Sequence, residues 1–526
     1  MKRYLTAVFA ICMLLPSCSD LELNESQYHT KKYQFSDFDK VKEVMTNVYG
    51  YLESGFYSFQ ECATDDAVYA NSPDTIKTWY DGSWSPNNLI DDKWAHFYAG
   101  IRAANYLIEN CPEDFEIARW NEQYNVWLEQ LKNYPWEARA LRAWFHMELL
   151  KRYGNIIIAD RTFSSGEVNS LMPSTFGESV EWISGELEEC ARHLPETYSG
   201  TYYSEVGRVT RGFAQAARIR LLLYAASPLN NPSGSSEKYA EAADAARAMI
   251  EECSASLRFT LSRQKCNAES RDLIFGIREA SDPSYEYMNF PAGYENGGSG
   301  TCPSLNLVEA FEAGDPRLAE AVISNGDSFK GMTVESFYGG RNGQPLDNAS
   351  PTSFYLRKYV QESTSLTSGN LISYPHIWPV FRYAEVYLNY AEALFEATGD
   401  PDFTGTLGTS VYSLSPRAAL NALRSVWSMP EIPAGLSTSG FRQRLRNERR
   451  VELCFEGHRF WDIRRWKTGE LTRTIYGLRI TGSADGGFTS EKVQVASRVW
   501  DDKMYLYPIP EVERHKNANL LQNPGW

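Results

Sequence analysis

The sequence lacks an excess of positive charge. Of its 526 residues, 52 are Lys or Arg and 67 are Asp or Glu, which gives a formal net charge of −15. A protein that binds nucleic acid needs a basic field to displace counterions from the phosphates. The charge balance therefore argues against a nucleic-acid partner, and we expect none.

The sequence also lacks zinc-binding motifs of cysteine and histidine and calcium-binding motifs of the EF-hand kind. The nine cysteines include no CxxC pair and no histidines at zinc-ligand spacing. Three acidic pairs lie outside any EF-hand pattern, and we interpret them as solvated turns, with calcium binding as the alternative: Asp65-Asp66, Asp91-Asp92 and Asp501-Asp502. We predict neither a metal site nor a cofactor. The disulfide state of the seven cysteines after the N-terminal segment is left open by the sequence.

Long apolar runs are scarce, and the one at the N-terminus is short. Residues 4–15 follow Lys2 and Arg3, and their length suits a signal peptide rather than a membrane-spanning helix. The next residues, LPSC, resemble a bacterial lipobox. We therefore predict a lipoprotein signal peptide over residues 1–17, a lipid anchor on Cys18, and an anchor-and-tether segment over residues 18–34. The alternative is an ordinary secretory signal with an unmodified Cys18.

What the chain has in abundance is amphipathic helix pattern, with apolar residues three and four positions apart. We predict helices at residues 35–52, 94–111, 120–134, 135–153, 176–194, 209–226 and 239–253. Successive helices of this length with small alanines at their contacts favour stacked helical hairpins of the tetratricopeptide kind. The predicted fold class is therefore mainly α, with this helical-hairpin scaffold in an N-terminal region over residues 35–270.

The amino-acid composition changes in the C-terminal region, residues 271–526. Residues 279–375 are rich in Gly, Ser, Pro, Asn and Tyr, and they predict a long loop-rich insertion. Such loops are often functional. Helices are predicted to resume at residues 379–399, 416–427 and 438–455 in a C-terminal subdomain, before a second loop-rich segment at residues 477–503.

Charges of both signs alternate in RNERRVELCFEGHRFWDIRRW, residues 446–466. Three glutamates recur every fourth residue, which aligns them on one helix face beside arginines. We predict an internal ion-pair network formed by Glu448, Arg449, Arg450, Glu452, Glu456 and Arg459. The alternative is a glycosidase in which Glu452 or Glu456 acts with His458, but no second carboxylate or nucleophile is defined. We therefore predict no catalytic residue.

This stretch closely resembles the C-terminal hallmark of the SusD/RagB family of outer-membrane nutrient-binding lipoproteins. Four further segments agree with the family in the same order: ARALRAWFHMELLKRYGNIII, RVTRGFAQAARIRLLLYAASPL, PVFRYAEVYLNYAEALFEATGD and the closing LYPIPEVERHKNANLLQNPGW. The resemblance extends from the lipobox to Trp526.

The resemblance implies a non-enzymatic, lipid-anchored protein on the outside of the outer membrane. It implies a body of tetratricopeptide-like helix pairs, with a ligand site in the loop-rich region. It also implies a partner, a SusC-like TonB-dependent transporter, to which glycans or other nutrients are delivered. The sequence does not identify the glycan, and it leaves open a peptide or glycoprotein ligand and, as a further alternative, a glycoside hydrolase.

A glycan site needs aromatic faces for stacking and polar groups for hydroxyls. Two loop stretches provide both, residues 78–88 and 285–294. The candidate ligand-binding residues are Trp79, Tyr80, Asp81, Trp84, Asn87, Tyr285, Tyr287 and Tyr294. The alternative for Trp79 and Trp84 is that they pack the loop against the helices.

Overall fold

The computed structural model describes residues 30–53, 58–71, 73–115, 118–198, 205–256, 258–263, 270–483 and 486–526. The predicted signal peptide, the anchor at Cys18 and most of the tether lie outside these ranges, as does Cys266. The other six cysteines after Cys18 are free thiols.

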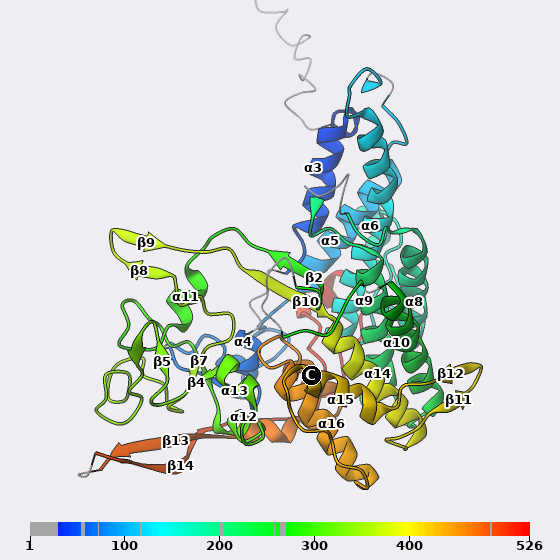
Figure 1. Ribbon diagram of the computed structural model, residues 1–526. Coiled ribbons are helices and arrows are strands. Elements are labelled where there is room, and N and C mark those ends of the chain that lie inside the picture. The colour runs from blue at the N-terminus through cyan, green and yellow to red at the C-terminus, as the bar shows by residue number, and fades with distance from the viewer. Residues whose placement is uncertain are drawn as a thin grey trace, which may run out of the picture.

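One side of the molecule is an array of long helices (Figure 1). The helices of the N-terminal region are α2 (Lys31–Gln34), α3 (Phe38–Tyr49), α4 (Ser58–Glu61), η2 (Lys77–Trp79), α5 (Trp94–Asn110), α6 (Tyr124–Tyr153), α7 (Ser165–Val168), α8 (Phe176–His193), α9 (Arg211–Ala226) and α10 (Ser236–Ser256). Successive long helices pack on one another in the order α5, α6, α8, α9 and α10. The predicted mainly α, tetratricopeptide-like fold is confirmed.

The remaining helices belong to the C-terminal region. They are α11 (Ser284–Asn289), α12 (Leu305–Val308), α13 (Pro316–Ala321), α14 (Tyr383–Thr398), α15 (Pro416–Val426), α16 (Thr438–Glu452), α17 (Arg459–Arg465), η5 (Gly469–Arg473), η6 (Asp502–Tyr505) and α18 (Glu511–Lys516). Helix α14 packs on both α10 and α15. The helical array therefore continues from the N-terminal into the C-terminal region.

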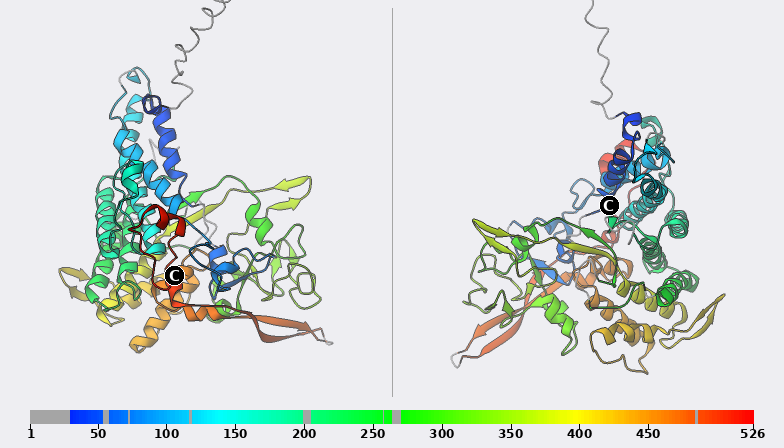
Figure 2. Two further views of the ribbon diagram at one scale, coloured as in Figure 1. Left: turned by 180° about the vertical axis from the view of Figure 1, so that it is seen from behind. Right: turned by 45° about the horizontal axis from the view of Figure 1, so that its top comes forward.

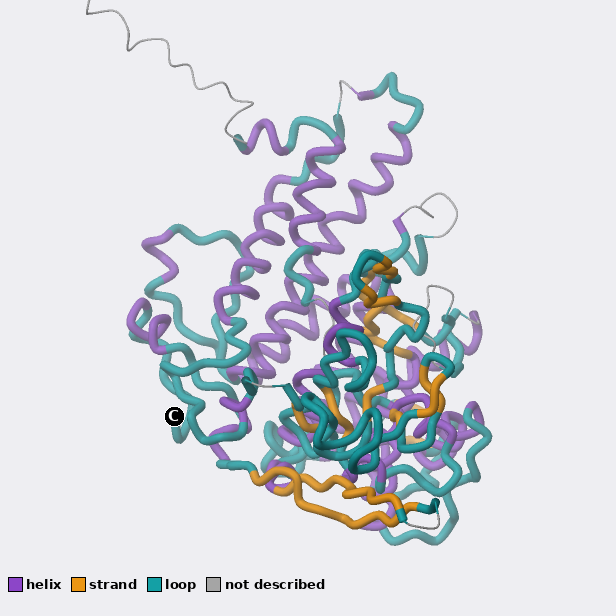
Figure 3. Tube along the Cα trace, turned by 90° about the vertical axis from the view of Figure 1, so that its left-hand side faces the viewer, coloured by secondary structure: helices purple, strands orange, loops and turns teal. Residues whose placement is uncertain are grey.

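The strands pair two by two, always antiparallel. They are β1 (Ala67–Tyr69) with β3 (Thr301–Pro303), β2 (Leu273–Arg278) with β10 (Ile377–Arg382), β4 (Val322–Ile323) with β7 (Tyr355–Leu356), β5 (Ser328–Phe329) with β6 (Met332–Thr333), β8 (Ser365–Thr367) with β9 (Asn370–Ile372), β11 (Gly405–Leu407) with β12 (Ser410–Tyr412), and β13 (Thr474–Gly482) with β14 (Phe488–Ser497). Most lie on the side opposite the helical array, together with the loops of the insertion (Figure 3).

Two predicted segments differ from the structure. Residues 120–153 were expected to form two helices separated at Pro135, but α6 continues through this proline. Proline removes one backbone hydrogen bond, and here burial of Leu131, Tyr134 and Ala138 on both sides of it outweighs that loss. The predicted loop 477–503 contains instead most of the β13–β14 hairpin, which projects from the body (Figure 2).

Two buried histidines are held in the neutral form. His146 accepts a hydrogen bond at Nε2 from the Ala159 amide (3.0 Å), and its Nδ1 lies 2.8 Å from the Arg142 carbonyl oxygen. Burial lowers the pKa of His146 to about 3. Burial, together with the nearby Arg220 and Arg449, holds the pKa of His458 well below its usual value.

Acid should therefore destabilise the protein through these histidines. An unfolded histidine takes up a proton near pH 6.5, whereas folded His146 stays neutral down to about pH 3, so the free energy of unfolding falls as pH drops through that window. The loss is at most about 1.4 kcal/mol per pH unit per histidine. Urea denaturation at pH 7 and pH 5 should show a smaller loss for His146→Gln than for the wild type. Equal losses would contradict this assignment.

Candidate ligand-binding site

The first predicted stretch is fixed to the C-terminal tail. The Trp84 side chain is 1% exposed, and its ring centroid lies 4.8 Å from that of Tyr507 and 5.2 Å from that of Trp526. Trp79 is 6% exposed and packs 5.5 Å from Phe460. Neither ring offers a broad face for stacking, so their burial favours the packing alternative, and the ligand-stacking role stays a prediction.

Three other candidates of this stretch are more accessible. Tyr80 is half-buried, its hydroxyl donates to the Asp74 carboxylate, and the Arg498 guanidinium lies 4.4 Å from its ring centroid. Asp81 and Asn87 are exposed. These side chains lie on the surface of the stretch that the two tryptophans hold in place.

The second stretch is mostly buried as well. Tyr285 is 5% exposed, its hydroxyl donates to the Lys358 carbonyl (3.0 Å), and its ring packs 4.9 Å from Trp378. Tyr294 is 9% exposed and donates to the Phe329 carbonyl. Their burial likewise favours packing over ligand stacking, and a ligand-binding role stays a prediction for both. Tyr287, with 38% exposure, does present a ring to solvent.

A cavity of about 590 Å³ lies beside the first stretch, between the end of α3, α4, η2 and the start of α5. Its volume is in the range of small-ligand sites. The half-buried rings of Phe59 and His96 line it, and Trp79 forms part of its edge. The sequence did not single out Phe59 or His96 as ligand-binding residues, because both lie on helices, α4 and α5, where a structural role is the usual one for a ring.

Ion pairs and a hydrogen bond hold the polar groups of this cavity in place. The Arg152 guanidinium, 1% exposed on α6, lies 3.2 Å from Glu53 and 3.4 Å from Asp91. Lys93 Nζ lies 2.8 Å from Glu53. Gln60 donates through Nε2 to Asp91 at 3.3 Å. Two carboxylates, an amide and an ammonium group are thus pre-positioned beside two rings.

The electrostatics of the two carboxyl groups differ. Burial raises the pKa of Asp91, although Arg152 opposes this effect. Burial also acts on Glu53, but there Arg152 and Lys93 prevail and hold its pKa below the usual value. The pair Asp91-Asp92 is therefore no solvated turn, because Asp91 is part of a partly buried ion-pair cluster.

A second cavity, of about 630 Å³, lies beside the second stretch, between α13, residues 357–362 and the end of α16. His376, whose ring contacts Tyr285 at 5.5 Å, is in its wall, as is Lys358. Each predicted stretch therefore adjoins one cavity, although most of the predicted aromatic rings lie behind the cavity surfaces.

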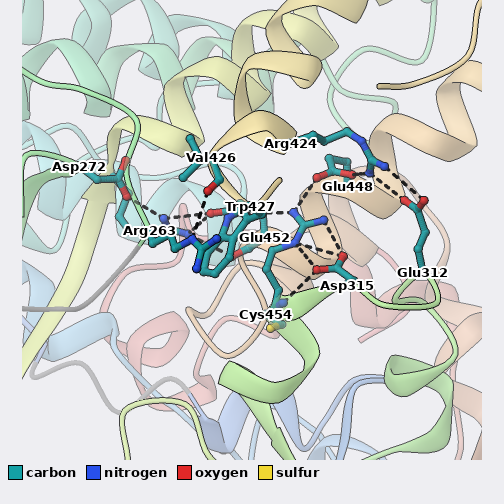
Figure 4. A network of polar contacts seen from close by, with 12 residues as sticks. Arg263, Asp272, Glu312, Asp315, Arg424, Val426, Trp427, Glu448, Glu452 and Cys454 are labelled. Atoms are coloured by element: carbon teal, nitrogen blue, oxygen red, sulfur yellow. Dashed lines mark hydrogen bonds and ion pairs between the residues drawn. The ribbon is translucent and has the colours of Figure 1, made fainter. Parts of the chain in front are cut away.

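The six charged residues predicted to form a network all have partners of opposite charge. Arg382 lies at the centre of this network and is 1% exposed. Its guanidinium nitrogens lie 2.7 Å from a carboxylate oxygen of Asp272, 3.2 Å from one of Glu452 and 2.8 Å from one of Glu456. The other pairs are Arg317 and Arg424 with Glu448, Arg449 with Asp462, Arg450 with Asp65 and Asp66, Arg459 with Asp65, and Lys358 with Glu456. Figure 4 shows part of this network.

The network bears on two interpretations of the sequence. Asp65 and Asp66 are buried and bound by Arg450 and Arg459, so they are not a solvated turn. The carboxylates of Glu452 and Glu456 are occupied by Arg382 and by other cations. This geometry supports structural rather than acid–base roles for both.

Within the described ranges, no cluster of three or more His, Cys, Asp or Glu side chains could hold a metal ion. No described helix is at once long enough and apolar enough to span a membrane.

Comparison with known proteins gives a consistent result. The model of the SusD family matches residues 261–526. A SusD-like protein of Formosa agariphila is 23% identical over 100% of both chains. The starch-binding protein SusD of Bacteroides thetaiotaomicron is 30% identical over 42% of this chain and 35% of its own. The crystal structure of a SusD-like protein from Bacteroides fragilis shares the fold, with a TM-score of 0.77, 23% identity, and coverage of 94% of this chain and 98% of its own.

Proposed function

The chain belongs to the SusD family, and on this premise we propose that it binds glycans non-covalently in the cavity between α3, α4 and α5. The observation that carries the proposal is the placement of Phe59 and His96 beside carboxylates already fixed by Arg152. Rings stack on the C–H faces of sugars, and fixed carboxylates accept hydrogen bonds from hydroxyls. The starch-binding relative supports a carbohydrate as the ligand class.

We further propose the cellular setting that the family implies. Lipidated Cys18 anchors the protein to the outer membrane, with its body facing outside. The captured glycan passes to a SusC-like TonB-dependent transporter. The half-buried candidate Tyr80 and the exposed candidates Asp81, Asn87 and Tyr287 extend the glycan-contacting surface beyond the cavity.

Calorimetric titration of the chain starting at Ser19 with plant, host and microbial oligosaccharides tests the proposal. A Phe59→Ala/Gln60→Ala variant should bind the preferred glycan about 10-fold more weakly or worse, because one stacked ring and one hydrogen-bonding amide each contribute about 0.5–1.5 kcal/mol. The matched control is Trp120→Ala, which removes a side chain that is 95% exposed and lines neither cavity. Its affinity should equal that of the wild type.

Two results would count against the proposal. If the protein bound peptides but no oligosaccharide, its ligand class would be peptides and not glycans. Undiminished glycan affinity in the folded Phe59→Ala/Gln60→Ala variant would remove the site from this cavity. Circular dichroism of each variant establishes that it is folded before its affinity is compared.

A further inference from the structure

The cavity beside α13 shares no lining residue with the one assigned above. Its walls come from both sides of the molecule: α13 and residues 357–362 from the loop-rich side, and Trp427 with the end of α16 from the helical scaffold. Its volume of about 630 Å³ is within the range of small-ligand sites. The question is which ligand chemistry its walls would accept.

Tyr359 provides a ring held in a fixed orientation. The residue is half-buried, and its backbone φ of 65° is in the left-handed region, which a bulky side chain rarely adopts. Its ring packs edge-on against Trp378, with centroids 5.7 Å apart and an interplanar angle of 82°. Strained residues persist only where surrounding structure enforces them, and they concentrate at ligand-binding places. The Tyr359 ring is therefore a pre-organised platform in the wall.

The cations of the cavity wall are already neutralised. Arg317 contacts Asp315 at 2.8 Å and Glu448 at 2.6 Å. Lys358 contacts Glu456 at 2.7 Å, and Arg357 contacts Glu362 at 2.6 Å. Among the described residues of the wall, no Lys or Arg side chain lacks an anionic partner that would compete with an anionic ligand.

Two polar groups of the wall stay available. Glu320 is exposed, and within the described ranges no cation pairs with its carboxylate. Gln361 donates through Nε2 to the Pro375 carbonyl (3.1 Å), while its amide oxygen has no hydrogen-bond donor in the described part of the chain. The cavity thus offers hydrogen-bond acceptors and one uncompensated negative charge.

We propose that this cavity is a second carbohydrate-binding site, selective for neutral or amino sugars over uronic or sulfated ones. The inference deepens the glycan-binding function proposed above and rests on it. Hydroxyls and ammonium groups find acceptors at Glu320 and Gln361, and a sugar ring stacks on Tyr359. A carboxylate or sulfate is repelled by Glu320, with no free cation to compensate. A polysaccharide that reaches both cavities makes its second contact intramolecularly, which raises its overall affinity.

The test is titration of four proteins with neutral, amino and acidic oligosaccharides: the wild type, Phe59→Ala/Gln60→Ala, Tyr359→Leu/Gln361→Ala, and all four substitutions combined. We expect two binding events in the wild type, one in each double variant and none in the quadruple variant. Because Tyr359 has strained backbone geometry, Gln361→Ala alone, at a half-buried side chain, is measured in parallel and should weaken the second event by about 3- to 10-fold.

Charge selectivity has its own variant. Glu320→Gln keeps an acceptor oxygen but removes one like charge, so it should narrow the preference of this cavity for neutral over acidic oligosaccharides by about 3-fold or more.

The outcomes separate the two proposals. Loss of all glycan binding in Phe59→Ala/Gln60→Ala would overturn the second site and leave the proposed function standing. An unchanged second event in Gln361→Ala and Tyr359→Leu/Gln361→Ala would also overturn it. No binding of any oligosaccharide by the wild type would overturn both. If only the Tyr359→Leu/Gln361→Ala variant lost binding, the glycan site would be the cavity beside α13, and the cavity between α3, α4 and α5 would no longer be a candidate.

Discussion

Replacing Arg382 by alanine should lower the free energy of unfolding by about 3–5 kcal/mol, because it leaves three buried carboxylates without their shared cation. The guanidinium contacts Asp272, Glu452 and Glu456, all of which are buried. Burial raises the pKa of Asp272 to about 6 even with Arg382 present. Without Arg382, the negative charges would repel one another in a poorly solvated place.

Urea denaturation at pH 7 measures this loss, and Arg192→Ala is the matched control. The Arg192 side chain is 60% exposed and pairs with Glu188 and Glu189 on the same helix, so its removal should change the free energy of unfolding by no more than about 1 kcal/mol. Similar small losses for both variants would show that the Arg382 network is not a main support of the fold.

Replacing Trp84 by alanine should also destabilise the protein by about 3–5 kcal/mol, because a fully buried ring is exchanged for a cavity. Trp84 connects the loop after η2 to Tyr507 and Trp526, near the end of the chain. The loss is measured by thermal or urea denaturation, with Trp120→Ala as the exposed control. Glycan affinity measured where Trp84→Ala is still folded should change little.

The opposite result for Trp84→Ala, unchanged stability with lost binding, would contradict this prediction. A Trp84→Ala variant with wild-type stability and no glycan binding would restore the ligand-stacking role that its burial argues against. For the same reason, loss of binding in any variant of Trp79 or Trp84 identifies a ligand site only when the folded fraction has been measured alongside.

The helical scaffold could be predicted from the sequence because it follows from local periodicity, and the same periodicity indicates the charged network. Glu448, Glu452 and Glu456 are four positions apart, which puts them on one helix face. The helix also has an apolar face that is buried, so acidic side chains beside arginines are stable there mainly as ion pairs. Their partners could not be predicted. Arg317 and Arg382 come from distant parts of the chain, and only the tertiary fold brings them to α16.

The candidate site was harder to predict because exposure is a tertiary property. Trp84 and Tyr285 lie in sequence stretches rich in Gly, Pro and Asn, which predicted exposed loops. In the structure the C-terminal tail covers Trp84, while Tyr285 lies on α11 and packs against Trp378. The β13–β14 hairpin had a local signal that was missed: two runs rich in β-branched residues flank the turn sequence SADGG. Continuation of α6 through Pro135 had no local signal, since it depends on packing.

Hydrogen exchange measured with and without the best-binding oligosaccharide tests glycan capture at the α3–α4–α5 cavity most directly. Slower exchange on ligand addition is expected at residues 58–61, 75–79 and 90–96, three segments that each contain residues lining this cavity. Protection confined to other parts of the chain, or no protection at saturating ligand, would contradict it.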